Sequence, residues 1–109
     1  EIRGIFAQEA QESGAKLNFN VTVNCKAYEM NTNDLPAKRY QSACEIVGVE
    51  PEFVETYGGS DFNILAEKGM IGLVLSNAMN DVHSCKEYTS VADLVQSTQI
   101  VTKIMQDNR

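Results

Sequence analysis

Two polar loops carry the residue types that could do chemistry, and the first is the turn Gly58-Gly59-Ser60-Asp61. Paired glycines let backbone N–H groups approach a ligand closely, and the amino terminus of a following helix favours an anion such as a carboxylate. The Ser60 hydroxyl could add one hydrogen bond to such a ligand. The alternative is a tight turn in which Ser60 or Asp61 caps the helix, and the spacing alone leaves both interpretations open.

The second loop contains His83, the single histidine of the chain, with Asn80 and Asp81 before it and Glu87 after it. A neutral imidazole there could bind zinc while a carboxylate holds its other ring nitrogen. A lone histidine in a polar loop can equally be a solvated side chain. One histidine does not make a zinc site, because such a site needs three or four ligands.

The composition of the 109 residues is that of an ordinary globular domain, with 43% hydrophobic and 22% charged residues. The formal net charge of -6 comes from scattered acids, so no basic face is available for nucleic acid. No apolar stretch approaches the roughly 20 residues that a membrane-spanning helix requires. The three cysteines, Cys25, Cys44 and Cys85, form no CxxC pair, which predicts reduced thiols and a cytoplasmic location.

The amino-terminal part of the chain predicts one helix and one strand. Apolar residues at helical spacing followed by Gly14 predict a helix over residues 2–13. Alternating apolar residues predict a strand over residues 17–23. We therefore expect residues 1–24 to form one unit, followed by a polar linker at 25–33.

The remaining residues, 34–109, predict a second unit of the α/β class with parallel strands in the order αβαβα. The expected helices cover residues 34–47, 61–68 and 90–106, and the last of them begins with a capping box formed by Ser90 and Asp93. The expected strands cover residues 53–57 and 71–75, and a right-handed crossover makes them parallel. Both polar loops then lie at the carboxyl ends of strands, where ligands collect in this class of fold.

The order and spacing of the Gly58-Gly59-Ser60-Asp61 turn, the isolated His83-Ser84 with Glu87, and the final capped helix resemble a known family. The match runs from residue 2 to residue 106. It resembles the closing third of the zinc-dependent exopeptidases that include peptidase T, glutamate carboxypeptidase, aminoacylase and succinyl-diaminopimelate desuccinylase, with peptidase T-like proteins most similar. The resemblance implies that residues 1–24 end a ferredoxin-like lid or dimerisation domain. It implies that residues 34–109 are the carboxyl-terminal half of the catalytic domain.

The same resemblance implies a role for each loop residue. His83 matches a ligand of one of the two zinc ions expected in the parent enzyme, and Gly59 with Ser60 matches the turn that approaches the substrate. The residues implied to support the site are Gly58, Asp61 and Glu87. Members of the family often carry a glycine and a glutamate shortly before the histidine, where this chain has Ala78 and Asn80.

Several parts of the family's catalytic machinery have no counterpart in this chain. These are the upstream H-x-D, the bridging aspartate, the adjacent glutamates that supply the general base and a ligand, and the remaining acidic ligand. A zinc-bound water needs that base and a full set of ligands to attack an amide carbonyl. We therefore expect the 109 residues alone to be inactive and to bind no zinc tightly.

The expected parent is a cytoplasmic metallopeptidase that hydrolyses short peptides, and the chain, which begins at Glu1 within a helical pattern, looks like a piece of that larger protein. One alternative is an amidohydrolase of N-acyl amino acids, or a carboxypeptidase, of the same family. A second alternative is a non-catalytic module in which the first helix and strand pair with another copy to make a homodimer.

Overall fold

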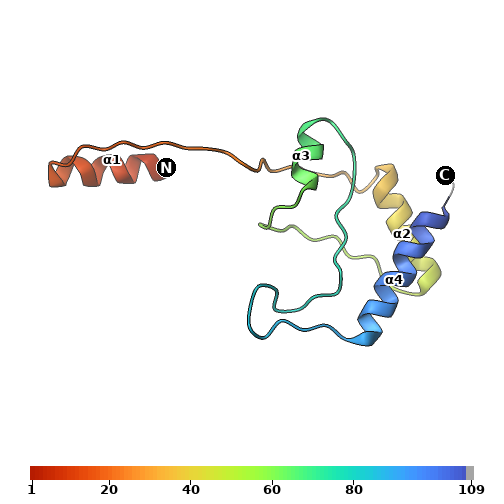
Figure 1. Ribbon diagram of the computed structural model, residues 1–109. Helices are drawn as coiled ribbons and strands as arrows, with labels where there is room; N and C mark the ends of the chain where they lie inside the picture. Colours follow the sequence, from red (N-terminus) through yellow and green to blue (C-terminus); the bar gives the residue numbers. More distant parts are fainter. Residues whose placement is uncertain (108–109) are drawn as a thin grey trace.

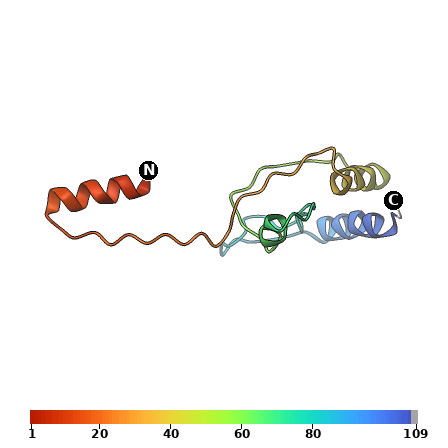
Figure 2. The ribbon, with the colours of Figure 1, turned by 90° about the horizontal axis from the view of Figure 1, so that it is seen from above.

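The computed structural model describes residues 1–107 and contains four helices joined by long irregular segments (Figure 1). The helices are α1 (Ile2–Ser13), α2 (Leu35–Val47), α3 (Phe62–Glu67) and α4 (Val91–Gln106). The molecule is elongated, with principal extents of 64, 36 and 19 Å. Helix α1 lies at one end, and α2 and α4 lie at the other (Figures 1 and 2).

All four helices lie where the sequence predicts them, and local signals explain their ends. Helices α1 and α2 stop at Gly14 and Gly48, whose φ angles of 68° and 80° are left-handed and suit glycine. One of the two hydrogen bonds of the capping box predicted at the start of α4 is confirmed, because the Ser90 hydroxyl accepts a hydrogen bond from the Asp93 backbone N–H at 3.0 Å. These signals act within one turn of chain, so sequence alone identifies them.

Helices α2 and α4 pack side by side and contain the small core (Figure 2). The buried apolar residues among those described are Ala37, Ala43 and Cys44, and all three belong to α2. Arg39 joins the two helices, because its guanidinium donates to the backbone carbonyls of Ile104 at 2.7 Å and of Asp107 at 2.6 Å. The carboxyl-terminal end of α4 is thereby fixed to the middle of α2.

Helix α1 is held by the segment that follows it. The ring centroids of Phe6 and Phe19 lie 5.4 Å apart. The Arg3 guanidinium lies over the Phe19 ring and donates a hydrogen bond to the Phe19 backbone carbonyl at 3.2 Å. None of the residues of α1 is buried. In Figures 1 and 2 this helix lies apart from the other three and is joined to them by an extended stretch of chain.

The prediction of an α/β fold with parallel strands is wrong, and so is the prediction that a helix and a strand at residues 1–24 form part of a ferredoxin-like lid. Over residues 1–107 the structure is helical and has no sheet, and the residues expected as strands at 17–23, 53–57 and 71–75 pair with nothing. A strand exists only where its backbone hydrogen-bonds to a neighbour. Side-chain alternation predicts an extended backbone but does not supply that neighbour.

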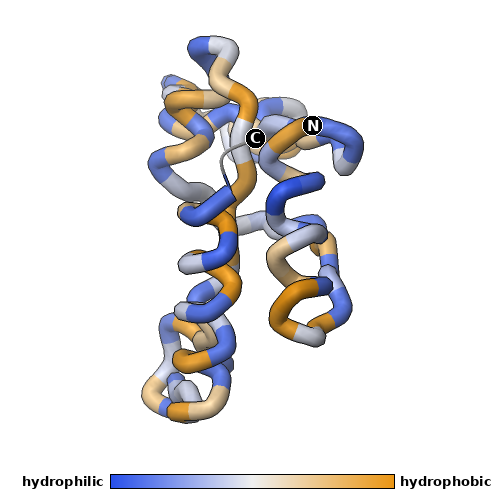
Figure 3. Tube along the Cα trace, turned by 90° about the vertical axis from the view of Figure 1, so that its right-hand side faces the viewer, coloured by the Kyte–Doolittle hydropathy of each residue, from blue (hydrophilic) through white to orange (hydrophobic). Residues whose placement is uncertain are grey.

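Much apolar surface is left uncovered in this arrangement. Figure 3 shows hydrophobic stretches distributed along the chain rather than gathered at one centre. Large apolar side chains are exposed on every helix, including Ile2, Leu35, Ile64 and Val91. Across the described residues, no helix is both long enough and apolar enough to cross a membrane.

Candidate functional site

The turn at Gly58–Asp61 is held in shape by a buried asparagine. Asn63 is 8% exposed, and its side-chain Oδ1 accepts a hydrogen bond from the Ser60 backbone N–H at 2.8 Å. Its Nδ2 donates to the Lys26 carbonyl at 2.8 Å, which ties the turn to a segment more than thirty residues earlier. Asp61 occupies the position before α3 but makes no capping hydrogen bond through its side chain, so α3 begins without a side-chain cap.

The role of Asn63 was not predicted from the sequence, although the spacing of this residue from Ser60 contains a signal. Asparagine side chains commonly bond to backbone groups a few residues away, and Asn63 follows Ser60 by three residues. Its second bond, to the Lys26 carbonyl, joins parts of the chain that are distant in sequence. No local pattern predicts a contact of that kind.

Gly59 lies directly against Cys25. A Cβ atom built at position 59 would come 2.9 Å from the Cys25 Sγ, which is closer than real Cβ contacts, so the absence of a side chain permits this approach. Gly58 has more room, because a Cβ there would lie 3.5 Å from the Thr56 Oγ1 in ordinary contact. All four turn residues are exposed, and no hydrogen-bond partner for the Gly59 N–H lies among the described residues.

The His83 loop is closed by a pair of backbone hydrogen bonds. The Asn80 N–H donates to the Tyr88 carbonyl at 2.9 Å, and the Tyr88 N–H donates back to the Asn80 carbonyl at 3.1 Å. Inside the loop, the Glu87 carboxylate accepts a hydrogen bond from the His83 backbone N–H at 2.8 Å. Glu87 therefore supports the backbone of His83 rather than its imidazole.

The backbone of this loop is left-handed at three non-glycine residues. The φ angles are 62° at Ala78, 49° at Asp81 and 64° at His83. Histidine and aspartate adopt this conformation more readily than most residues, whereas alanine does so rarely. His83 is exposed, so its ring faces solvent on a backbone that the loop holds fixed.

In the part of the chain that the structure describes, no hydrogen bond joins the turn before α3 to the loop at residues 80–88. Within residues 1–107, no group of three or more histidine, cysteine or acidic side chains could hold a metal ion. His83 therefore belongs to no such group among the described residues.

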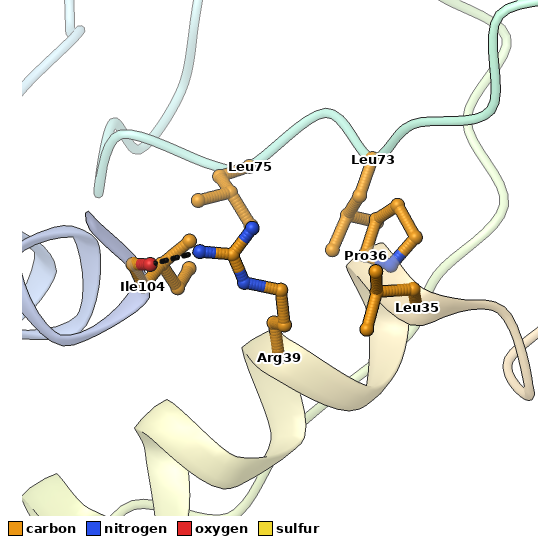
Figure 4. Close-up of a pocket in the computed structure, with 6 residues that line it drawn as sticks. All are labelled: Leu35, Pro36, Arg39, Leu73, Leu75 and Ile104. Carbon is orange, nitrogen blue, oxygen red and sulfur yellow. Dashed lines mark hydrogen bonds between the residues drawn. The ribbon is translucent and has the colours of Figure 1, made fainter. Parts of the chain in front are cut away.

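A cavity of about 170 Å³ lies elsewhere, between α2, α4 and the segment at residues 73–75. Figure 4 shows its lining, which is Leu35, Pro36, Arg39, Leu73, Leu75 and Ile104. The lining is mostly apolar, and the Arg39 Nη2 within it is already bonded to backbone carbonyls. The cavity therefore has the character of a packing gap between elements, and it is separate from both loops.

Comparisons with known proteins give one weak similarity. The chain is 21% identical over 107 residues to the uncharacterized protein YqjE of Bacillus subtilis (strain 168), covering 98% of this chain and 29% of YqjE. The chain thus spans less than a third of the length of that relative. No family model and no solved structure matches the chain.

Proposed function

We propose that this chain is part of a zinc-dependent peptidase that hydrolyses short peptides, with His83 as one of the ligands of its two zinc ions. The observation that carries the proposal is the geometry of the His83 loop. The loop is closed at Asn80 and Tyr88, and Glu87 holds the His83 N–H at 2.8 Å while the histidine remains exposed. A ligand whose backbone is fixed before metal arrives loses less conformational freedom on binding.

The remaining ligands and the general base belong, in this proposal, to the rest of a longer polypeptide. The similarity to YqjE supports that assignment, because the aligned residues cover only 29% of its length. The 109 residues alone are then inactive, since hydrolysis by a zinc-bound water needs a complete set of ligands and a base. Zinc would supply an activated water and polarise the peptide carbonyl.

Gly59 and Ser60 are the proposed contacts to the substrate. The Ser60 N–H already donates to Asn63 and the Gly58 N–H to the Thr56 Oγ1, whereas the Gly59 N–H and the Ser60 hydroxyl are two of the donors of the turn that remain for a ligand. The hydroxyl lies 3.5 Å from the Asn63 Oδ1, a long hydrogen bond that a ligand oxygen can replace. Both groups suit a carboxylate or carbonyl of a short peptide.

We place the protein in the cytoplasm. The three cysteines are free thiols in the structure, with Cys25 and Cys85 exposed and Cys44 buried. Exposed free thiols persist in a reducing compartment, which supports this location.

The test is the substitution His83→Asn in the full-length protein, because asparagine tolerates the left-handed backbone of position 83. We expect the bound zinc, measured by mass spectrometry, to fall, and the turnover of dipeptides and tripeptides to fall by more than about 100-fold. The matched control is Asp81→Asn, which changes an exposed residue of the same loop with the same backbone handedness and leaves the imidazole in place. Normal zinc content and normal turnover in His83→Asn would contradict the proposal.

A substrate panel separates the proposed activity from its relatives. N-acyl amino acids are included beside the peptides in the same assay. Hydrolysis of the peptides alone supports a peptidase. Hydrolysis of the acylated compounds alone overturns that activity in favour of an amidohydrolase.

A further inference from the structure

The exposed surface of this chain is far larger than a protein of its size has when it is fully packed. The accessible area is 9199 Å² for a mass of 12.0 kDa. A compact monomer of that mass exposes about 6,000 Å², so roughly 3,200 Å² is in excess. The radius of gyration agrees, since it is 20.2 Å where a compact chain of this length has about 13 Å.

The segment at residues 71–75 contributes to this excess in its side chains and in its backbone. Ile71 is 65% exposed and Val74 is 48% exposed, while Leu73 and Leu75 line the cavity against α2 and α4 (Figure 4). Over residues 1–107 the structure gives the backbone N–H and C=O groups of this segment no hydrogen-bond partner. We call the outward side chains of Ile71 and Val74, with the backbone of residues 71–75, the 71–75 surface.

The position of the 71–75 surface is fixed from within the chain. Gly72 lies against the ring of Phe62, where an added Cβ would come 2.4 Å from the ring atom Cε2. The Phe62 ring in turn packs edge-on against Tyr28 at a centroid distance of 5.0 Å. The segment is thus anchored on two sides, and an apolar face with unsatisfied backbone groups remains on the outside.

We infer that the 71–75 surface is covered by the remaining polypeptide of the longer protein, which also hydrogen-bonds to the backbone of this segment. Area decides between that occupant and a second copy of the chain. A standard interface between two proteins buries about 800 Å² on each partner and a large obligate one about 1,000–2,500 Å², and both values are below the excess of roughly 3,200 Å² found here. An exposed area of this size is expected for one part of a larger folded protein. The aligned residues cover only 29% of YqjE, so a protein of that length has enough additional chain to cover the excess.

This inference rests on the proposed function only in placing the chain within a longer polypeptide. Zinc binding and catalysis can fail while the 71–75 surface is still covered. The reverse also holds, because a zinc ligand at His83 does not require burial of Ile71 or Val74. A measurement of backbone protection therefore tests this inference separately from the peptidase proposal.

The experiment is hydrogen–deuterium exchange of the full-length protein without added zinc, read on peptides that span residues 71–75. The reference is the same peptides in the full-length protein unfolded in urea, where their amides are unprotected. Covered and hydrogen-bonded amides should exchange at least about 100-fold more slowly than this reference, at every protein concentration. Exchange at the rate of the unfolded reference overturns the inference, and protection that disappears on dilution to a monomer overturns it in favour of a second copy.

Discussion

The substitution Arg39→Met should weaken the packing of α2 on α4 by about 3 kcal/mol. Arg39 donates to two carbonyls at the end of α4, at 2.7 and 2.6 Å, and each bond from a charged donor contributes about 1.5 kcal/mol at a site that is partly exposed. Its Nε lies 3.8 Å from the Asp107 carboxylate, which adds less than about 1 kcal/mol at this exposure. Methionine keeps the apolar stem of the side chain in the cavity and removes only the donors.

The assay is urea unfolding followed by far-ultraviolet circular dichroism, with Lys38→Met as the control. Lys38 precedes Arg39 on the same helix and is exposed, so its substitution removes an equal charge without breaking a contact between helices. Because the partners of Arg39 are mainly neutral carbonyls, the loss in Arg39→Met should persist at high salt. An equal effect of the two substitutions, or a loss that salt abolishes, would refute the assigned role.

Two further predictions concern other contacts of the structure. Gly72→Ala should destabilise the chain by about 1–3 kcal/mol in the same unfolding assay, because the new methyl group meets the Phe62 ring at 2.4 Å; an unchanged midpoint would show that the ring yields freely. Burial raises the pKa of Tyr40 above its ordinary 10.0, helped by the Cys44 side chain. The unfolded chain therefore loses this proton at a lower pH than the folded chain, so the free energy of unfolding should fall as the pH rises above 10.0. Tyr40→Phe should remove that part of the decline. Identical pH profiles of the two proteins would contradict this expectation.

The helices could be predicted from the sequence because their signals are local. Gly14, Gly48 and the pair Ser90 and Asp93 each act within a turn of the chain that they end or begin. The strands could not be predicted in the same way. The alternation at residues 17–23 describes side chains, whereas a strand depends on a neighbour that the pattern does not specify.

The candidate site also combines short-range contacts, which spacing in the sequence indicates, with long-range contacts, which it does not indicate. Glu87 was expected beside His83, four residues away, and it lies there, although it binds the backbone N–H rather than the ring. The contacts of Gly59 with Cys25 and of Asn63 with Lys26 span more than thirty residues. They arise from the path of the whole chain, which short-range spacing does not contain.

The left-handed backbone at Ala78 has a consequence in evolutionary terms. An L-residue other than glycine, asparagine or aspartate costs roughly 1–2 kcal/mol in that conformation, and the φ of Ala78 is 62°. Glycine at position 78 would remove that cost and only a methyl group, and the added backbone entropy of the unfolded chain would offset about 0.4–1 kcal/mol of the gain. A single mutation of Ala78 to glycine, in the loop that contains His83, can therefore increase the stability of the protein. The more stable protein can then tolerate a destabilising mutation elsewhere.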